Sequence, residues 1–225
     1  MSATVAIVAG EGGPLGHATA VALADGLTVV AVDRTEHAMG DLPEDIRREV
    51  ADATGPAEAA RLIGRIAGEV GPPDALVNTI GAFRPEDVLA TTPEMLRLML
   101  DVNLGPALWL TQAVAPHMRQ QGSGAIVHVA ARPGIEPAGG MAAYSASKAA
   151  LVHLTRILDI ELRPYGIRVN AVAPQLLDTP RNEAIFPAEA IAHAVAPEAI
   201  ADVIAFLVSD AAAPVSGAIL PAYGA

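Results

Sequence analysis

The sequence predicts an α/β fold in which a doubly wound parallel sheet of about seven strands has helices on both faces. Two observations carry this prediction. Short apolar runs alternate with helical patterns along all 225 residues, as expected for strands joined by right-handed helical crossovers. Runs such as Thr4–Ala9 and Leu27–Val32 are also apolar throughout, as in strands covered on both faces. No repeat, charge block or linker interrupts the alternation, so we expect one domain over residues 1–225.

The elements follow one another in a regular order. Thr92 is a suitable N-cap with Pro93 at the first helical position, and Pro164 and Gly166 end a later helix. The predicted strands are Thr4–Ala9, Leu27–Val32, Arg48–Ala51, Ala75–Asn78, Ala125–Ala130, Arg168–Val172 and Ala218–Leu220. The predicted helices are an alanine-rich one after Gly16, then Ala57–Glu69, Pro93–Gln121, Met141–Leu162 and Pro197–Val208. Met95, Leu96 and Met99 are expected to form a buried helix stripe, and His128 to be a packed, hydrogen-bonded core histidine.

Composition excludes several classes of function. The net charge of −11 argues against nucleic acid or an anionic membrane as the main partner. The chain has no cysteine, which rules out disulfides, thiolate nucleophiles and zinc–sulfur sites. Its histidines lack ligand spacing, so no metal is expected. No apolar run reaches the roughly 18 residues of a membrane span, and a cytoplasmic protein is the default expectation.

A glycine-rich turn follows the first predicted strand. Gly10, Gly13 and Gly16 give the spacing G-x-x-G-x-x-G before a helix. Such a turn lets the backbone approach a pyrophosphate and directs free helix amides at it. Pro14 removes one amide donor, but the amides of Leu15 and Gly16 remain. We expect a dinucleotide to bind here.

Asp33 ends the second predicted strand, where a carboxylate accepts the adenosine ribose hydroxyls and repels a 2′-phosphate. This favours NAD(H) over NADP(H). Arg34 leaves NADP(H) open, because a guanidinium there can pair with a 2′-phosphate or stack on adenine.

Tyr144 and Lys148 are four residues apart and therefore project from one helix face. A tyrosine with its ordinary pKa near 10 is a poor acid or base at neutral pH. A nearby ammonium stabilises the phenolate and lowers that pKa. The pair follows the fifth strand, where a bound nicotinamide is expected, and we assign it a catalytic role.

These features, taken together, resemble one known family, the short-chain dehydrogenase/reductases, over essentially all 225 residues. The resemblance implies a Rossmann-type fold and NAD(P)-dependent hydride transfer to or from a small molecule. The segments that carry it are VAGEGGPLG at 8–16, Asp52, LVNTIGAF at 76–83, DVNLGPA at 101–107, YSASK at 144–148 and IRVNAVAPQLLDTP at 167–180.

The resemblance also assigns roles to single residues. Tyr144 supplies a proton, Lys148 binds the nicotinamide ribose and Asn103 supports the proton path through a water. Further cofactor contacts are implied at Asp52, at Asn78 and Gly81, and at Pro174 and Thr179. The helices 93–121 and 141–162 are implied to form a homodimer or homotetramer contact.

The chain departs from the family at the position of the catalytic serine, which here is Ala131. The dihydropteridine reductase-like branch is similar in having alanine there, a following basic residue (Arg132) and Gly140-Met141 before the tyrosine. The same branch also matches Leu177–Pro180 and Asn182. It reduces quinonoid dihydropterins with NADH.

Three functions therefore remain open: a dihydropterin reductase, a ketoreductase or dehydrogenase for an activated carbonyl or alcohol, and a catalytically weak dinucleotide-binding protein. The span between Thr179 and Pro197 is short and predicts an open or small pocket, with Phe186 and Phe83 as walls. Arg132 is expected either to contact substrate or to be solvated.

Overall fold

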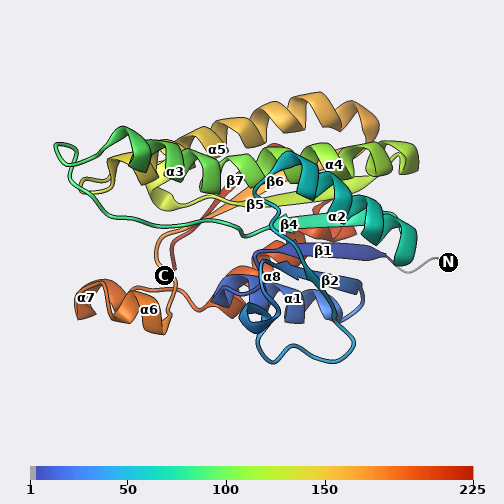
Figure 1. Ribbon diagram of the computed structural model, residues 1–225, viewed down its shortest axis with the longest axis horizontal. Helices are drawn as coiled ribbons and strands as arrows, with labels where there is room; N and C mark the ends of the chain where they lie inside the picture. Colours follow the sequence, from blue (N-terminus) through green and yellow to red (C-terminus); the bar gives the residue numbers. More distant parts are fainter. Residues whose placement is uncertain (1–3, 225) are drawn as a thin grey trace.

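A computed structural model describes residues 4–224, and a seven-stranded parallel sheet runs through this part of the chain (Figure 1). Its order is β3-β2-β1-β4-β5-β6-β7, which is the Rossmann-type arrangement that the alternation predicts. The strands are β1 (Val5–Ala9), β2 (Thr28–Asp33), β3 (Arg47–Val50), β4 (Pro73–Asn78), β5 (Gly124–Val129), β6 (Ile167–Pro174) and β7 (Ile219–Ala222).

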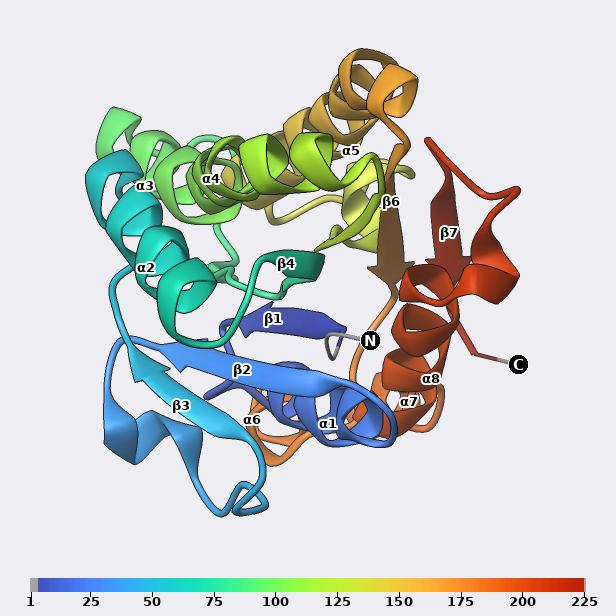
Figure 2. The same ribbon diagram turned by 90° about the vertical axis from the view of Figure 1, so that its right-hand side faces the viewer.

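Helices cover both faces of the sheet. Figure 2 shows α2, α3, α4 and α5 on one side, and α1 and α8 on the other. The bounds are α1 (Pro14–Ala24), α2 (Pro56–Glu69), α3 (Pro93–Asn103), α4 (Gly105–Gln121), α5 (Ala142–Leu162), α6 (Pro180–Glu183), α7 (Ala188–Ile191) and α8 (Pro197–Val208). Most of these helices have proline at the first or second position, where the missing N–H has no intrahelical partner and the fixed φ suits a helix.

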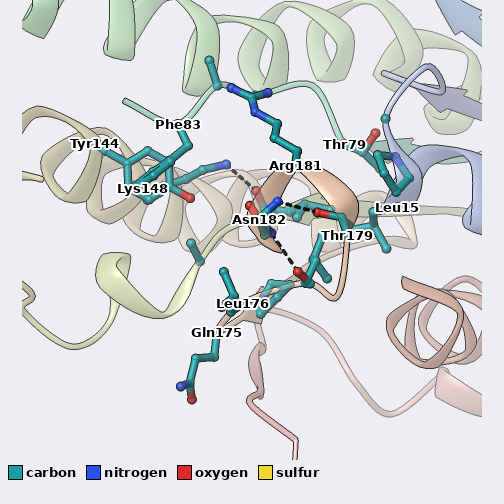
Figure 3. A pocket seen from close by; sticks show the side chains of 18 of the residues that line it. Leu15, Thr79, Phe83, Tyr144, Lys148, Gln175, Leu176, Thr179, Arg181 and Asn182 are labelled. Atoms are coloured by element: carbon teal, nitrogen blue, oxygen red, sulfur yellow. Dashed lines mark hydrogen bonds between the residues drawn. The ribbon is translucent and has the colours of Figure 1, made fainter. Parts of the chain in front are cut away.

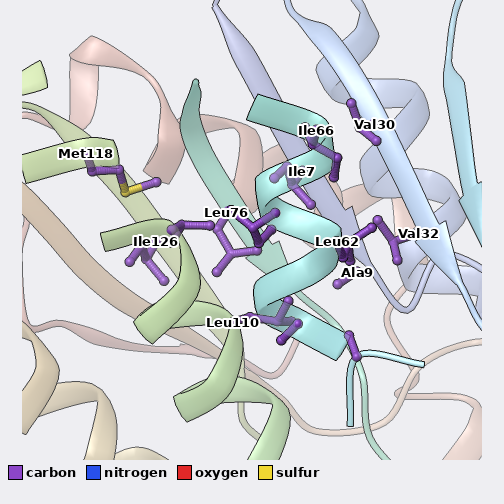
Figure 4. Close-up of a cluster of buried hydrophobic side chains, with 14 of the residues drawn as sticks. Ile7, Ala9, Val30, Val32, Leu62, Ile66, Leu76, Leu110, Met118 and Ile126 are labelled. Atoms are coloured by element: carbon purple, nitrogen blue, oxygen red, sulfur yellow. The ribbon is translucent and has the colours of Figure 1, made fainter. Parts of the chain in front are cut away.

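The core consists of two apolar layers, one on each face of the sheet. Alternate residues of a strand point to opposite faces, so Ile7 packs with α2 and α4 while Val8 packs with α1 and α8. Figure 4 shows the first layer, in which Leu62, Leu110 and Ile126 are fully buried. Because both faces are covered, inner strands such as β1 and β2 are apolar along most of their length rather than alternating, whereas the edge strand β3 has the sequence RREV.

One predicted helix is wrong in its extent. Residues Pro93–Gln121 form two helices, α3 and α4, which meet at Leu104. The cause is Pro106, which has no N–H for the carbonyl four residues earlier. The buried stripe is also narrower than predicted. Met95 and Met99 are buried, whereas Leu96 is 40% exposed because it lies about 100° around the helix from Met95.

The strand boundaries differ from the predicted ones by one or two residues. The third strand is Arg47–Val50 rather than Arg48–Ala51, and the last is Ile219–Ala222 rather than Ala218–Leu220. The sixth strand runs on to Pro174 because its end pairs with β7, where Pro174 lies beside Ala222. The partner strand sets such ends, and apolar pattern alone does not reveal it.

No helix within residues 4–224 is long and apolar enough to span a membrane. Residues 1–3 and 225 lie outside the described part of the chain, so the assignment of residues 1–225 to one domain stays a prediction.

His128 is a core histidine, as expected from its place in a strand. It is fully buried, and its Nε2 lies 3.4 Å from the hydroxyl of Thr111 on α4. Burial lowers the pKa of His128 to about 3, because a charged imidazolium is poorly solvated in the core. The folded protein therefore holds this side chain neutral.

Replacing His128 with Asn should make stability less sensitive to acid. Between its ordinary pKa of 6.5 and about 3, the unfolded chain binds a proton here that the folded chain does not. Stability is therefore lost as the pH falls through that range. From pH 7 to pH 4.5, the wild type should lose about 2 to 3 kcal/mol more unfolding free energy than His128→Asn in urea titrations. His153→Asn, at an exposed position of α5, is the control and should behave as the wild type does. Equal losses in wild type and His128→Asn would contradict this account.

Candidate cofactor and active site

The order of the strands creates a crevice between β1 and β4. The chain moves from β1 outward through β2 and β3, then crosses back to add β4 on the other side of β1. Ligands of open parallel sheets bind outside the carboxyl ends of the strands at such a switch point. Thr79, directly after β4, donates its hydroxyl to the carbonyls of Ala9 and Gly10 at 3.0 and 2.9 Å and so joins the two strand ends.

A cavity of about 450 Å³ lies at this edge of the sheet. The glycine-rich turn, the segment after β4, the ends of β5 and β6, the start of α5, and α6–α7 line it (Figure 3). The cavity brings together many of the residues that the sequence singles out: Gly10, Gly13, Leu15, Gly16, Gly81, Ala131, Tyr144, Lys148, Pro174 and Thr179.

Two glycines of the turn are required by close contacts. Gly16 lies so near the start of the turn that a Cβ would be 2.2 Å from the carbonyl oxygen of Gly10. Gly10 has φ +90°, and a Cβ there would be 2.7 Å from the nitrogen of Ile80. At Gly13 the nearest atom to such a Cβ is 3.8 Å away, so the contacts there are ordinary. The glycines at 10 and 16 let β1 pass directly into α1.

Most backbone amides of the turn already donate to acceptors in the turn or in β2. Among residues 4–224, only the amides of Leu15 and Gly16 in this turn have no hydrogen-bond acceptor, and both open α1 at the cavity wall. Pro14 has no N–H to offer. The other donors bind within the protein: those of Gly10 and Glu11 to Val32 O, that of Gly12 to Asp33 Oδ2 and that of Gly13 to Gly10 O. The two free amides are suited to an anionic group.

The predicted adenosine-side residues Asp33, Arg34 and Asp52 are not part of the cavity wall, and Asp33 contacts the turn. Asp33 accepts the amide of Gly12 at 3.0 Å and that of Arg34 at 2.7 Å. Hydrogen bonds from the hydroxyl and amide of Thr54 lower the pKa of Asp52, and the charge of Arg34 acts in the same direction. Arg34 thus lies close enough to Asp52 for their charges to interact, and Asp33 is the carboxylate fixed against the turn.

Tyr144 and Lys148 both face the cavity from the first turns of α5, as their spacing predicts. The ammonium of Lys148 donates to the carbonyl of Val129 at the end of β5, at 2.8 Å. Burial lowers the pKa of Lys148 to about 8 and raises that of Tyr144 to about 12. The expected lowering of the Tyr144 pKa by Lys148 is therefore wrong for this arrangement, since desolvation of the phenol prevails.

Tyr144 belongs to a row of three aromatic rings in the cavity wall. The ring of Phe83, from the segment after β4, meets the Tyr144 ring edge-on with centroids 4.9 Å apart. On its other side, Phe83 lies 5.8 Å from the ring of Phe186, which belongs to the short segment between Thr179 and Pro197. All three rings line the cavity, so Phe83 and Phe186 are walls of the pocket as expected.

Asn103 and Asn78 are buried and do not line the cavity. Asn103, the last residue of α3, accepts the amide of Ala82 at 2.9 Å and donates to its carbonyl at 3.1 Å and to Ser147 at 3.0 Å. Asn78 accepts the amide of Ile80 at 3.1 Å. Both side chains therefore hold the backbone of the β4–α3 segment, and Asn103 ties it to α5.

The end of β5 brings Arg132 to the rim of the cavity. Arg132 pairs with Glu136 at 2.8 Å, donates to Gln175 at 2.8 Å and lies over the ring of Tyr223. It is thus held among protein groups rather than simply solvated. Ala131 itself forms part of the cavity wall.

Sequence reasoning missed several residues of the wall, among them Thr79, Leu176 and Arg181. Thr79 follows a strand at the switch point directly, and that position was a usable signal. Arg181 directly follows the segment 167–180 quoted above, but nothing in its local pattern shows that its side chain crosses a cavity.

Comparison with known proteins agrees with this geometry. Residues 4–190 match the family described as short chain dehydrogenase. The chain is 36% identical to cis-4-hydroxycyclohexanecarboxylate dehydrogenase of Sinomonas cyclohexanicum, over 98% of this chain and 95% of that one. It is 31% identical to 3-oxoacyl-[acyl-carrier-protein] reductase FabG of Thermotoga maritima, over 96% and 94%.

A solved structure described as a short-chain dehydrogenase/reductase from Burkholderia xenovorans is similar with a TM-score of 0.91 and 30% identity. That likeness covers 98% of this chain and 95% of the other. Sequence, fold and the arrangement of the cavity agree, and the chain belongs to the short-chain dehydrogenase family of oxidoreductases.

Proposed function

We propose that this protein is an NAD(P)-dependent oxidoreductase that interconverts an alcohol and a carbonyl on a small, largely apolar substrate. One observation carries the proposal: a single cavity contains both the two free amides of the glycine-rich turn and the Tyr144–Lys148 pair. The amides would bind an anion, and Tyr144 with Lys148 would donate or accept a proton. A dinucleotide with its pyrophosphate at one end and its nicotinamide at the other uses both.

The residues present fit such a cofactor. The Leu15 and Gly16 amides would hold the pyrophosphate, and Thr179 and Pro174 would lie along the nicotinamide half. Lys148 would hold the nicotinamide ribose. The bound cofactor would supply or accept the hydride.

Tyr144 is proposed to hold the proton that moves to or from the substrate oxygen. Burial raises its pKa to about 12, so at neutral pH the phenol is protonated and suited to donate in the direction of carbonyl reduction. In the direction of alcohol oxidation, the phenolate needs a nearby cation. Lys148 has a pKa of about 8 and therefore carries a positive charge on most molecules at pH 7. It is the other residue of α5 that lines the cavity, one helical turn after Tyr144.

The walls around Tyr144 support a flat or ring-shaped substrate. Phe83 packs edge-on against the Tyr144 ring, and Phe186 packs against Phe83 in the same cavity wall. The relative from Sinomonas is named for a hydroxylated cyclohexane ring. The cavity of about 450 Å³ has to hold part of the cofactor as well, which leaves room for a small molecule only.

Tyr144→Phe tests the proposed proton transfer. Loss of the hydroxyl should lower kcat for NADH-dependent reduction of a cyclic ketone about 10²- to 10⁴-fold, while the Kd for NADH stays unchanged. Tyr165→Phe is the matched control, because Tyr165 lies beyond the far end of α5 under Arg119 and should have no effect. A Tyr144→Phe enzyme with more than half of the wild-type kcat would contradict the role of Tyr144.

NAD(H) is proposed as the preferred cofactor because the Asp33 carboxylate is held beside the turn by the amide of Gly12. A 2′-phosphate placed there would meet a negative charge. Asp33→Asn keeps the hydrogen-bond acceptor and removes the charge. It should reduce the ratio of kcat/KM for NADH over NADPH about 10- to 100-fold, whereas Arg34→Gln should leave that ratio the same or raise it. A wild type that prefers NADPH would contradict the assignment.

A quinonoid dihydropterin is the second candidate substrate, and the observation that favours it is Ala131 in the cavity wall where the family's serine is expected. A serine hydroxyl orients a carbonyl and has less to do for a quinonoid ring. Without it, a simple ketone loses a donor worth about 10- to 1,000-fold in rate.

Ala131→Ser separates the two substrates. For the alcohol–carbonyl reaction, the serine should raise kcat on cyclic ketones at least about tenfold. If the wild type instead turns over quinonoid dihydropterin with NADH and the serine gives no gain, the dihydropterin is the substrate. Binding of NADH without turnover of either class would favour a dinucleotide-binding protein with little catalysis.

We also propose that the protein forms a homodimer or homotetramer through residues 93–121 and 141–162. Exposed apolar side chains on these helices support this: Leu98, Ile157 and, at 70% exposed, Ile160.

A further inference from the structure

The charges along the cavity are one-sided. The chain has a net charge of −11, yet no aspartate or glutamate is among the described residues that line the cavity. The two charged residues of the lining are Lys148 and Arg181. An acidic protein thus surrounds a cavity whose own wall is basic, which suits an anionic ligand.

The backbone around Arg181 is held by side-chain hydrogen bonds, whereas the Arg181 side chain is exposed and makes no ion pair within residues 4–224. It lies in α6, where Thr179 caps the helix by accepting the amide of Asn182 at 3.2 Å. The side chain of Asn182 in turn donates to the carbonyl of Leu177 at 2.8 Å. Figure 3 shows the Arg181 side chain extending from this segment across the cavity, between the Phe83–Tyr144 side and the Thr79–Leu15 side.

The guanidinium of Arg181 has no acceptor within residues 4–224: it takes part in none of the salt bridges or side-chain hydrogen bonds there. Arg132, at the rim of the same cavity, pairs with Glu136 and Gln175. Lys148 is engaged with the carbonyl of Val129 at 2.8 Å. Lys148 is already assigned to the nicotinamide ribose, so Arg181 is the basic group of the wall that remains for another part of the ligand.

The glycine-rich turn lacks a cation of its own. It offers two free amides, because Pro14 has none and the others bind within the turn or to β2. Two carboxyl groups lie close by: Asp33 beside Gly12, and the fully buried Glu11, which pairs with His17 through one oxygen at 2.8 Å and leaves the other unbonded. A pyrophosphate carries two negative charges, so amides alone beside these acids would neutralise it poorly.

We propose that Arg181 binds the pyrophosphate of the dinucleotide from the opposite side of the cavity and supplies the positive charge that the turn lacks. The inference rests on the proposed function, since it requires a dinucleotide in this cavity. A guanidinium fits the task because its planar set of N–H donors binds phosphate oxygens in pairs. The ligand is then held between the Leu15 and Gly16 amides on one side and Arg181 on the other.

Binding of ADP-ribose tests the proposal, because this probe has the pyrophosphate but no nicotinamide and needs no turnover. Arg181→Gln should raise the Kd of ADP-ribose about 10- to 100-fold in isothermal titration. The Kd of adenosine, which has no phosphate, should stay within about twofold. Arg181→Lys should lie between the two, since an ammonium keeps the charge without the paired donors. Added salt should weaken ADP-ribose binding more in the wild type than in Arg181→Gln.

Arg97→Gln is the matched control. Arg97 is exposed on α3, pairs with Glu94 and does not line the cavity, so its loss should leave ADP-ribose binding unchanged. Circular dichroism and thermal unfolding of all variants establish that they are folded.

Three results would overturn the inference. If Arg181→Gln binds ADP-ribose as tightly as the wild type but raises KM for an anionic substrate, Arg181 serves the substrate and not the pyrophosphate. If it changes neither, the side chain is solvated in the working protein. If the wild type itself binds neither ADP-ribose nor NADH, the proposed function fails and the pyrophosphate role fails with it, a result distinct from the first two.

Discussion

The contact between Gly10 and Gly16 is the constraint on which the functional edge of this molecule depends. The backbone closes so tightly that a Cβ on Gly16 would lie 2.2 Å from the carbonyl of Gly10. Only this approach allows β1 to lead straight into α1, with the amides of Leu15 and Gly16 left without partners at the cavity wall. The order of the strands then places the end of β4 beside the same turn. The two free amides at the cavity wall are thus a product of backbone geometry.

In the part of the cavity around Tyr144 and Lys148, burial shifts the pKa values of both side chains. Desolvation works against both charged forms there, raising the pKa of Tyr144 and lowering that of Lys148. The carbonyl of Val129 accepts a hydrogen bond from the ammonium of Lys148, and the ring of Phe83 packs edge-on against the ring of Tyr144. A proton therefore resides on Tyr144 at neutral pH, and charges brought by a ligand decide how readily it leaves. Arg181 adds positive charge to one wall of the cavity, and the free amides lie on the other wall.

Much of the fold follows from local pattern. Apolar runs marked the inner strands because both faces of a parallel sheet are covered, and the periodic segments marked the long helices. The edge strand β3 has the sequence RREV and is not an apolar run. Each error in the predicted bounds of helices and strands has a physical cause. Pro106 divided a predicted helix in two, and pairing with β7 extended β6. The exposure of Leu96 depends on which side of α3 meets α5, which no window of sequence contains.

The candidate site was predictable in part. The turn, Tyr144, Lys148 and Thr179 were recognisable from spacing and resemblance, and the structure brings them to one cavity. The pKa values of Tyr144 and Lys148 were not predictable, because they depend on how deeply the fold buries the two side chains. The bond of Lys148 to Val129 also depends on the fold. Asn103 proved to hold the segment after β4 rather than to face the cavity. Such outcomes depend on contacts between distant segments.

The central claim is that the free amides of this turn bind the pyrophosphate of a dinucleotide. Amide ¹H–¹⁵N spectra of the wild type, recorded during titration with NADH, test it most directly. The account predicts saturable shifts of the Leu15 and Gly16 amide signals, larger than those of amides already bonded within the turn, such as Glu11. Spectra in which NADH leaves the Leu15 and Gly16 signals unmoved would contradict it.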